Sequence, residues 1–381
     1  MTVIDKPALL ATVEPGRSEC FIPTPCGQNH ASFIHVLPDG ALGCVWFGGT
    51  QEGIPDISVH LSRLEAGATR WSAAEKLSDD PTRSEQNPLL FTTPSGALWL
   101  LWTAQLGGNQ DTALIRRRVS HDSGRTWNAV EEMIPEKPGF GTFIRSRIVV
   151  NPRGEWLLPI WRCTKPPEGA WTGNLDTSSV LISADEGKTW RESAVPGSTG
   201  CVHMSIVPHG AALVALYRSR WADNVYRSVS HDGGETWSAP QPTELPNNNS
   251  SVMALTLASG AIALMYNESS AADATGRRAS LYDDIGGAEV VASMSREAFW
   301  GAPRAPMSIA LSHDGGITWP HRRNLEVGDG FCMTNNSKDK LNREFSYPSL
   351  CQSADGALHL AYTYWRQAIK YVRTDENWIK A

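Results

Sequence analysis

The chain contains SHDSGRTW at Ser120–Trp127, SADEGKTW at Ser183–Trp190, SHDGGETW at Ser230–Trp237 and SHDGGITW at Ser312–Trp319. All four copies share the pattern Ser-x-Asp-x-Gly-x-Thr-Trp. A motif that returns at intervals of tens of residues indicates a repeat architecture. Asp and Gly favour a tight turn, whereas Thr and Trp favour the strand that follows it. Each copy therefore predicts one hairpin turn.

A second repeat runs out of phase with the first and consists of a turn ending in Gly, followed by an apolar strand. Its six copies begin at Leu37, Thr93, Asn151, Val207, Leu257 and Ser353. Degenerate copies of the first motif lie at Ser62–Trp71 and Arg373–Trp378. Six glycine turns that alternate with six tryptophans predict an all-β fold, a six-bladed β-propeller with four antiparallel strands in each blade.

The repeats fill the sequence without a linker, so residues 1–381 are expected to form a single domain. Residues 1–25 are expected to lead in and supply an edge strand. The longest interval between repeats predicts a loop insertion at residues 271–304. The sequence has 15 Trp, 33 Gly and 24 Pro and lacks long helical periodicity, so helices should be rare.

Composition also bounds the partners. The net charge is −6 and no basic stripe is visible, which argues against binding to nucleic acid or to an anionic membrane. The N-terminus lacks a signal-peptide pattern, and seven cysteines without regular spacing indicate free thiols, so a cytoplasmic location is expected. No His or Cys spacing predicts a metal site, and no cofactor is expected. A homo-oligomer remains open.

The Ser-x-Asp-x-Gly-x-Thr-Trp motif resembles the Asp-box of the sialidase (neuraminidase) superfamily, and the resemblance extends from about Phe21 to the end of the chain. It implies a BNR-repeat propeller whose site lies where the blades converge. Such sites hold three arginines that bind the carboxylate of the substrate. They also hold a nucleophilic tyrosine paired with a glutamate, and an acid/base aspartate on a loop.

Three residues match this family pattern. Tyr347, in EFSYPSL, stands where the family's nucleophilic tyrosine stands. Arg218 ends the strand VALYRSR, as the second family arginine does, and Arg304 precedes the last Asp-box as the third commonly does. Two arginines can bind a carboxylate through paired hydrogen bonds, in a geometry that lysine lacks. The structural alternatives are that Tyr347 merely starts a strand and that Arg218 and Arg304 form salt bridges at the rim of the propeller.

Other positions depart from the family. His30 occupies the position of the first arginine, and His203 stands near the position of the glutamate that pairs with the tyrosine. The loop Phe47–Ser58 supplies Glu52 or Asp56 as the acid/base. The remaining blade starts add further candidates for substrate binding: Asn29, Arg83, Glu85, Asn87, Arg145, Arg147, Asn249 and Glu344.

Three functions are consistent with these residues. The first is an exo-acting glycoside hydrolase for an acidic, carboxylated sugar, which needs a carboxylate-binding group, an acid/base and a nucleophile. The second is a lyase or related uronate-processing enzyme, in which a His/Tyr pair removes one proton and donates another. The third is a carbohydrate-binding propeller without catalytic activity. The expected partner in each case is an acidic oligosaccharide or glycoside.

Overall fold

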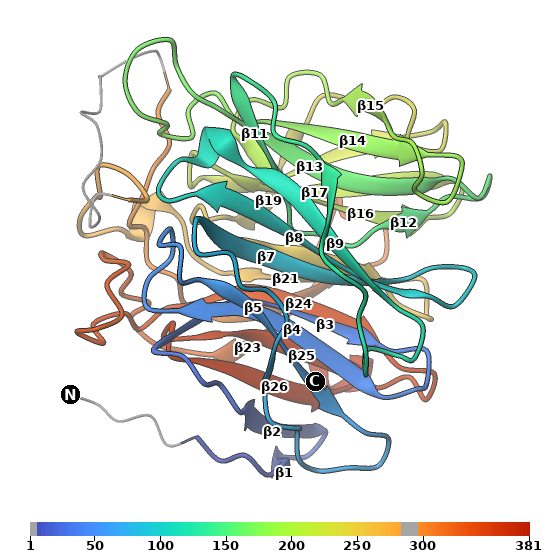
Figure 1. The fold of residues 1–381 in the computed structure, drawn as a ribbon. Helices are drawn as coiled ribbons and strands as arrows, with labels where there is room; N and C mark the ends of the chain where they lie inside the picture. The colour runs from blue at the N-terminus through green and yellow to red at the C-terminus, as the bar shows by residue number, and fades with distance from the viewer. Residues whose placement is uncertain (1–5, 283–295) are drawn as a thin grey trace.

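The computed structural model describes residues 6–282 and 296–381, and its strands form six antiparallel sheets (Figure 1). The prediction of an all-β, six-bladed propeller is confirmed. Each sheet is one blade, and its strands follow each other from the inside of the ring outward. The seven cysteines are free. Within the described residues, no helix is long and apolar enough to cross a membrane.

Blades 1 to 3 come from the first half of the chain. Blade 1 consists of β3 (Gln28–Val36), β4 (Leu42–Gly49), β5 (Ser58–Leu64) and β6 (Glu75–Lys76). Blade 2 consists of β7 (Arg83–Thr92), β8 (Leu98–Leu106), β9 (Leu114–Ser120) and β10 (Glu131–Ile134). Blade 3 consists of β11 (Phe140–Ile144), β12 (Val149–Val150), β13 (Trp156–Thr164), β14 (Thr177–Ser183) and β15 (Arg191–Ala194).

Blades 4 to 6 complete the ring. Blade 4 consists of β16 (Cys201–His209), β17 (Ala212–Ser219), β18 (Asn224–Ser230) and β19 (Gln241–Pro246). Blade 5 consists of β20 (Met253–Thr256), β21 (Ile262–Asn267), β22 (Met307–Ser312) and β23 (His321–Glu326). Blade 6 consists of β24 (Phe345–Gln352), β25 (Leu358–Tyr364) and β26 (Ala368–Thr374), with β2 (Arg17–Ile22) and β1 (Ala11–Glu14) at its edge.

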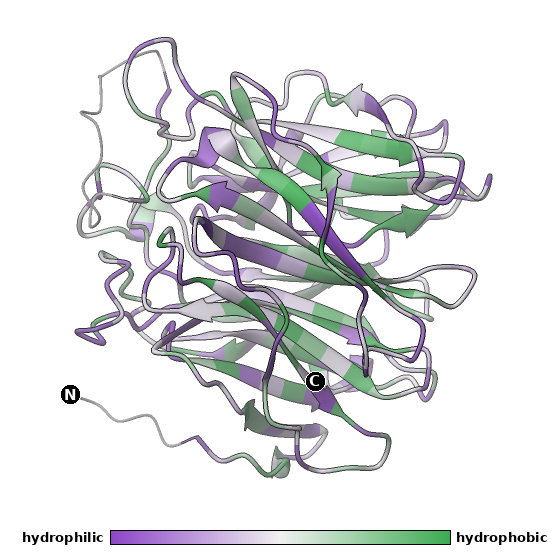
Figure 2. Ribbon diagram, in the orientation of Figure 1, coloured by the Kyte–Doolittle hydropathy of each residue, from purple (hydrophilic) through white to green (hydrophobic). Residues whose placement is uncertain are grey.

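Among the described residues, three short helical segments lie outside the blades. They are the 3-10 turns Gln110–Thr112 and Ala271–Asp273 and the helix α1 (Glu376–Lys380). One of these turns starts the expected insertion 271–304, of which residues 283–295 lie outside the described residues. The strand interiors are hydrophobic and the connecting loops mainly hydrophilic (Figure 2), as expected for blades that bury their faces against one another.

Each Asp-box forms the turn that its sequence predicts. In the copy at Ser230–Trp237, the Ser230 hydroxyl donates to Asp232 Oδ1 at 2.8 Å, and the Thr236 amide donates to the same oxygen at 2.9 Å. The Gly234 amide donates to Ser230 Oγ at 2.8 Å. The carboxylate therefore accepts hydrogen bonds from polar groups of the turn that have no partner in a neighbouring strand. The boxes follow the third strands of their blades and lie at the end of the ring opposite Tyr347.

The innermost strands share a local distortion at the end where Tyr347 lies. In β3, β7, β16 and β24 the pairing register shifts once, and a non-glycine residue with positive φ stands at each shift. These residues are Ala31, Asn87, His203 and Tyr347, with φ between 50° and 57°. Bulges of this kind redirect side chains, and L-residues adopt this conformation at a cost of about 1–2 kcal/mol each. These bulges therefore lower the stability of the fold, but they direct side chains toward the axis of the propeller.

Replacing the Asp-box carboxylate should weaken the blade. Asp232→Ala removes the acceptor for three donors of the turn. At a net ~0.5–1.5 kcal/mol for each of the three hydrogen bonds, the unfolding free energy should fall by about 1.5–4.5 kcal/mol. Urea denaturation followed by tryptophan fluorescence measures the change. His231→Ala is the matched control, because His231 belongs to the same box but its side chain is exposed. Equal stability of the two variants would contradict the structural role of Asp232.

Candidate functional site

Four arginines from four different blades surround Tyr347, and we call these four the arginine cluster. They are Arg145 between β11 and β12, Arg218 in β17, Arg304 before β22 and Arg366 in the turn between β25 and β26. The guanidinium carbons of Arg145, Arg218 and Arg304 lie 5.5–5.8 Å from the centre of the Tyr347 ring. All four side chains are buried.

Tyr347 is held by its hydroxyl group. Arg218 Nη1 donates to the Tyr347 hydroxyl oxygen at 2.8 Å. In the described part of the chain, Arg218 is the hydrogen-bond partner of this hydroxyl, and no carboxylate accepts its proton. A guanidinium in this position stabilises negative charge on the phenol oxygen.

Glu344 joins two members of the arginine cluster. Its Oε1 lies 3.1 Å from Arg304 Nη1 and 3.1 Å from Arg366 Nε. The Ser346 hydroxyl donates to the same oxygen at 2.6 Å. Burial alone would raise the pKa of Glu344, but Arg366 and Arg304 outweigh it and lower the pKa to about 2. Glu344 is therefore an anion at neutral pH that fixes two guanidinium groups side by side.

The two carboxylates of the loop Phe47–Ser58, Glu52 and Asp56, differ in burial and in their partners. Glu52 is buried, and its Oε2 accepts a hydrogen bond from Arg366 Nη1 at 2.6 Å. Asp56 is exposed and its Oδ2 accepts from the Thr50 amide at 3.0 Å, which closes its own loop. Of the two residues that the sequence proposes as the acid/base, Glu52 reaches the arginine cluster and Asp56 does not.

Arg145 is buried without a carboxylate partner. Its Nη2 donates to the backbone carbonyl oxygens of Ser32, Tyr347 and Pro348 at 2.9–3.0 Å. Burial lowers its pKa to about 10, so it remains a cation at neutral pH. Its Nη1 has no hydrogen-bond partner among the described residues. Arg145 thus carries a positive charge and an unused donor at the base of the cluster.

His30 lies against Tyr347, with 4.2 Å between the ring centres. Burial, and then Arg366 and the other arginines, lower its pKa well below the usual value. Neither ring nitrogen has a hydrogen-bond partner within the described ranges, and Nδ1 is 3.9 Å from Glu344 Oε1. His30 therefore lies beside Tyr347 as a neutral imidazole that adds no positive charge, and its role in the place of a carboxylate-binding arginine stays a prediction.

His203 is tied to the cluster through Arg218. Its Nε2 lies 3.2 Å from Arg218 Nη1, and its Nδ1 lies 3.0 Å from Ser251 Oγ. Burial, and then Arg218, lower the pKa of His203 well below the usual value. Because the guanidinium only donates, Nε2 accepts and Nδ1 carries the proton. The ring stacks on Trp161 at 4.2 Å, so His203 orients Arg218 and does not hydrogen-bond Tyr347.

The other expected binding residues divide into two groups. Asn249 accepts a hydrogen bond from Arg218 Nε at 2.8 Å and so belongs to the cluster. Asn87 occupies the bulge of β7, and its Oδ1 lacks a partner in the described chain. Arg147 lies farther along the strands, where Nη2 donates to the Leu350 carbonyl at 2.5 Å.

Three residues point away from the cluster. Asn29 accepts from the Trp46 indole at 3.1 Å, and its amide donates to backbone carbonyls. Arg83 pairs with Glu136 at 2.7 Å on the outside of blade 2. Glu85 accepts from the Trp102 indole at 2.7 Å and pairs with Arg116 at 3.1 Å. These side chains stabilise the blades. The sequence analysis expected them to line the site around Tyr347, and the structure does not place them there.

Arg366 is the site residue that the sequence interpretation missed. It follows the second strand of blade 6, in LHLAYTYWRQ, much as Arg218 stands at the end of the second strand of blade 4. Superposing the repeats on this second strand is the signal that finds it. Trp365 and Arg366 both have positive φ, 55° and 53°, which turns the arginine inward at the hairpin tip.

The site carries a net positive charge. Four buried guanidinium groups face two buried carboxylates, Glu344 and Glu52, while both histidines have lowered pKa values. Burying unpaired charge is costly unless a partner compensates it. An anion is therefore the ligand that this arrangement favours. Within residues 6–282 and 296–381, no group of three or more His, Cys, Asp or Glu side chains is arranged to hold a metal ion.

The family described as BNR repeat-like domain matches residues 40–360, most of the chain. The chain belongs to this BNR repeat family. No curated protein matches it at a significant level.

Solved structures share the fold of this BNR repeat protein at low identity. The Hadza microbial sialidase Hz136 is 15% identical with a TM-score of 0.67, over 92% of this chain and 66% of that one. A protein of unknown function from Dyadobacter fermentans is 15% identical with a TM-score of 0.68, over 95% and 100%. The intramolecular trans-sialidase from Ruminococcus gnavus, in complex with oseltamivir carboxylate, is 12% identical with a TM-score of 0.66, over 93% and 95%.

The buried histidines should make this BNR repeat protein sensitive to mild acid. The pKa values of His30 and His203 are lowered in the folded chain and near 6.5 in the unfolded chain, so below about pH 6.5 the unfolded state binds more protons. The unfolding free energy should fall between pH 7 and pH 5, by up to about 1.4 kcal/mol per pH unit for each histidine. Urea denaturation at several pH values measures this slope.

His30→Asn should reduce that slope by the contribution of one proton. His231→Asn is the matched control, because the His231 side chain is exposed, and it should leave the slope unchanged. A slope that is the same in the His30 variant and the unmodified protein would show that His30 is not buried in its neutral form.

Proposed function

We propose that this protein is a sialidase-like glycoside hydrolase that acts on a sugar with a carboxylate at or beside the reacting carbon. The observation that carries the proposal is the uncompensated positive charge of the arginine cluster around Tyr347. Arginine binds carboxylates through paired hydrogen bonds, and Glu344 holds two guanidiniums in adjacent positions for such an interaction. Solved sialidases that share 10–15% sequence identity with this chain have the same fold, and this likeness supports the proposal.

In this proposal Arg218, Arg304 and Arg366 bind the substrate carboxylate. The Tyr347 oxygen attacks the anomeric carbon and its proton passes to the adjacent His30 ring. The bond to the leaving oxygen breaks as Glu52, in its protonated form, donates its proton to that oxygen. Water then cleaves the glycosyl–tyrosine bond: its oxygen becomes the new hydroxyl on the anomeric carbon, one of its protons goes to Glu52, and His30 returns the other proton to Tyr347. A phenol is suited to this substrate because a neutral nucleophile repels the carboxylate less than an anionic one does.

One observation favours the second candidate, β-elimination from a uronate. The neutral ring of His30 lies 4.2 Å from Tyr347, and its nitrogens have no partner among the described residues. A neutral imidazole can remove the proton beside the carboxylate, and the Tyr347 hydroxyl can donate its proton to the leaving oxygen. The arginine cluster would stabilise the charge that develops on the carboxylate in that reaction.

Substituting the guanidinium of Arg366 tests the carboxylate-binding role. Arg366→Lys keeps the charge but removes the planar pair of donors, so kcat/KM on an acidic glycoside should fall about 10- to 100-fold. Binding of oseltamivir carboxylate, which the trans-sialidase from Ruminococcus gnavus binds, should weaken in parallel. Arg153→Lys is the matched control, since Arg153 pairs with Glu155 on the exposed Asp-box face. Unchanged kinetics in the Arg366 variant would rule out this role.

Product analysis separates the two reactions. On a panel of acidic oligosaccharides, hydrolysis should produce a new reducing end without ultraviolet absorbance, whereas elimination would add the absorbance of an unsaturated uronate. For hydrolysis through Tyr347, we expect Tyr347→Phe to lose at least 100-fold in kcat, in the range for removing a catalytic group. Binding without either product would leave only a carbohydrate-binding role.

A further inference from the structure

Glu52, the acid/base of the proposed reaction, stands on a loop that no strand pairing holds. β4 ends at Gly49 and β5 begins at Ser58, so residues 50–57 lie outside the sheet of blade 1. The acceptor of the Glu52 amide is a side chain: Gln28 Oε1 lies 2.5 Å from the amide nitrogen. A buried amide needs such an acceptor, and the side chain that supplies it fixes the backbone at that point. Gln28 therefore sets where Glu52 stands in the loop.

Gln28 is held at both ends of its own amide group. It is the first residue of β3, the innermost strand of blade 1, and it is fully buried. Its Nε2 donates to the Asn335 carbonyl at 3.0 Å and to the Ser337 hydroxyl at 2.6 Å. Because Oε1 faces a donor and Nε2 faces acceptors, one orientation of the amide satisfies all three partners. The side chain is thus a rigid link between them.

Asn335 and Ser337 belong to the loop between β23 and β24, which spans residues 327–344. This loop leads directly into the strand that carries Tyr347. The acid/base Glu52 and the tyrosine come from different blades, so a side chain that is bonded to both loops fixes one relative to the other. The buried glutamine at the start of β3 makes this connection.

The residue next to Gln28 holds the partner of Glu52. The Asn29 amide donates to the Arg366 carbonyl at 2.8 Å, and Arg366 Nη1 donates to Glu52 Oε2 at 2.6 Å. The start of β3 therefore holds the backbones of both members of this ion pair, Glu52 through Gln28 and Arg366 through Asn29. A carboxylate that is held at its backbone and at its oxygen has little freedom to move within the site.

We propose that Gln28 is a positioning residue for the proton transfer of the proposed reaction, because it holds Glu52 where the carboxyl group reaches the leaving oxygen. The inference rests on the proposed function, in which Glu52 is the acid. A misplacement of about 1 Å can cost a catalytic group ~100-fold in rate. A misplaced acid matters only for a leaving oxygen that needs its proton. Substituting Gln28 should therefore affect different leaving groups unequally, which a general loss of packing does not do.

The dependence on the leaving group tests this role. The probes are the 4-nitrophenyl and methyl α-glycosides of N-acetylneuraminic acid, because 4-nitrophenolate leaves without a proton and methoxide needs one. Gln28→Leu should lower kcat/KM on the methyl glycoside about ten-fold or more relative to the 4-nitrophenyl glycoside. Glu52→Gln is the reference variant, and there the relative loss should reach ~100-fold or more.

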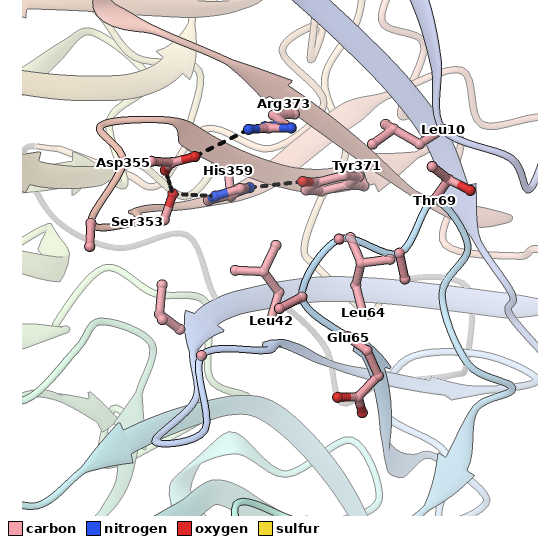
Figure 3. A pocket seen from close by; sticks show the side chains of 16 residues that line it. Leu10, Leu42, Leu64, Glu65, Thr69, Ser353, Asp355, His359, Tyr371 and Arg373 are labelled. Atoms are coloured by element: carbon pink, nitrogen blue, oxygen red, sulfur yellow. Dashed lines mark hydrogen bonds and ion pairs between the residues drawn. The ribbon is translucent and has the colours of Figure 1, made fainter.

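Gln352 is the matched control, because its side chain makes the same kinds of contact at the other end of β24. Its Oε1 accepts from the Ala258 amide at 2.8 Å, and its Nε2 donates to the Gly356 carbonyl at 3.1 Å. It directly precedes Ser353, whose hydrogen bond with His359 is drawn in Figure 3. Gln352→Leu should leave the relative kcat/KM of the two probes unchanged.

The reference variant separates two kinds of failure. If Glu52→Gln loses the methyl glycoside selectively but Gln28→Leu loses both probes by the same factor, Gln28 has no positioning role and the proposed function stands. If Glu52→Gln shows no selective loss, Glu52 is not the acid, and both the proposed reaction and the role of Gln28 are contradicted.

A crystal structure of Gln28→Leu gives a second measurement, which needs no turnover. The Glu52 carboxylate should lie more than about 1 Å from its place beside Arg366. If Gln28→Leu does not fold, Ser337→Ala replaces it, because that variant keeps Gln28 and every residue of the site. It should produce a relative loss of about three-fold on the methyl glycoside, as expected for one hydrogen bond. Glu52 in its original place, or no relative loss in Ser337→Ala, would overturn the proposal.

Discussion

The buried carboxylate of Glu344 is the group on which the site depends. Arg304 and Arg366 come from separate blades, and each lies 3.1 Å from the same oxygen. Two guanidiniums that contact the same oxygen repel each other in a medium of low dielectric, and the shared anion keeps them together. Glu344 immediately precedes β24 and stands three residues before Tyr347, so the start of this strand fixes both the cations and the phenol. The site is built around this strand.

Glu344 neutralises part of the cluster but leaves an excess of positive charge. Glu52 pairs with Arg366, which Glu344 also contacts, and backbone carbonyls solvate Arg145. The histidines have lowered pKa values because they are buried and because the arginines surround them, so they do not add to that charge. The result is a division of roles within one small volume. Arginines supply the charge, His30 and Tyr347 supply groups that can exchange protons, and His203 with Asn249 orients Arg218.

The fold could be predicted because the Asp-box is local: the hydrogen bonds from its Ser, Gly and Thr to the Asp or Ser side chain all lie within the same eight residues. Tyr347, Arg218 and Arg304 could be placed because they stand at fixed points of a repeat. Arg366 was missed because its inward direction depends on two residues of positive φ at a hairpin tip, which no composition pattern announces. The outward direction of Glu85 and Arg83 was missed for a similar reason, since their partner Arg116 lies in β9 and their partner Glu136 in the loop after β10.

The pairing of β2 with β26 has a consequence for how the chain reaches its native state. Thr374 donates to the Gly16 carbonyl, a contact between residues 358 positions apart. During synthesis, blades 1 to 5 can assemble one after another through local hairpins, but the ring stays open until the last strand leaves the ribosome. Closure then brings together two distant ends of the sequence, and contacts of such high sequence separation slow folding. The unpaired edge of β2 is exposed for most of that time, as an edge strand able to pair with another chain.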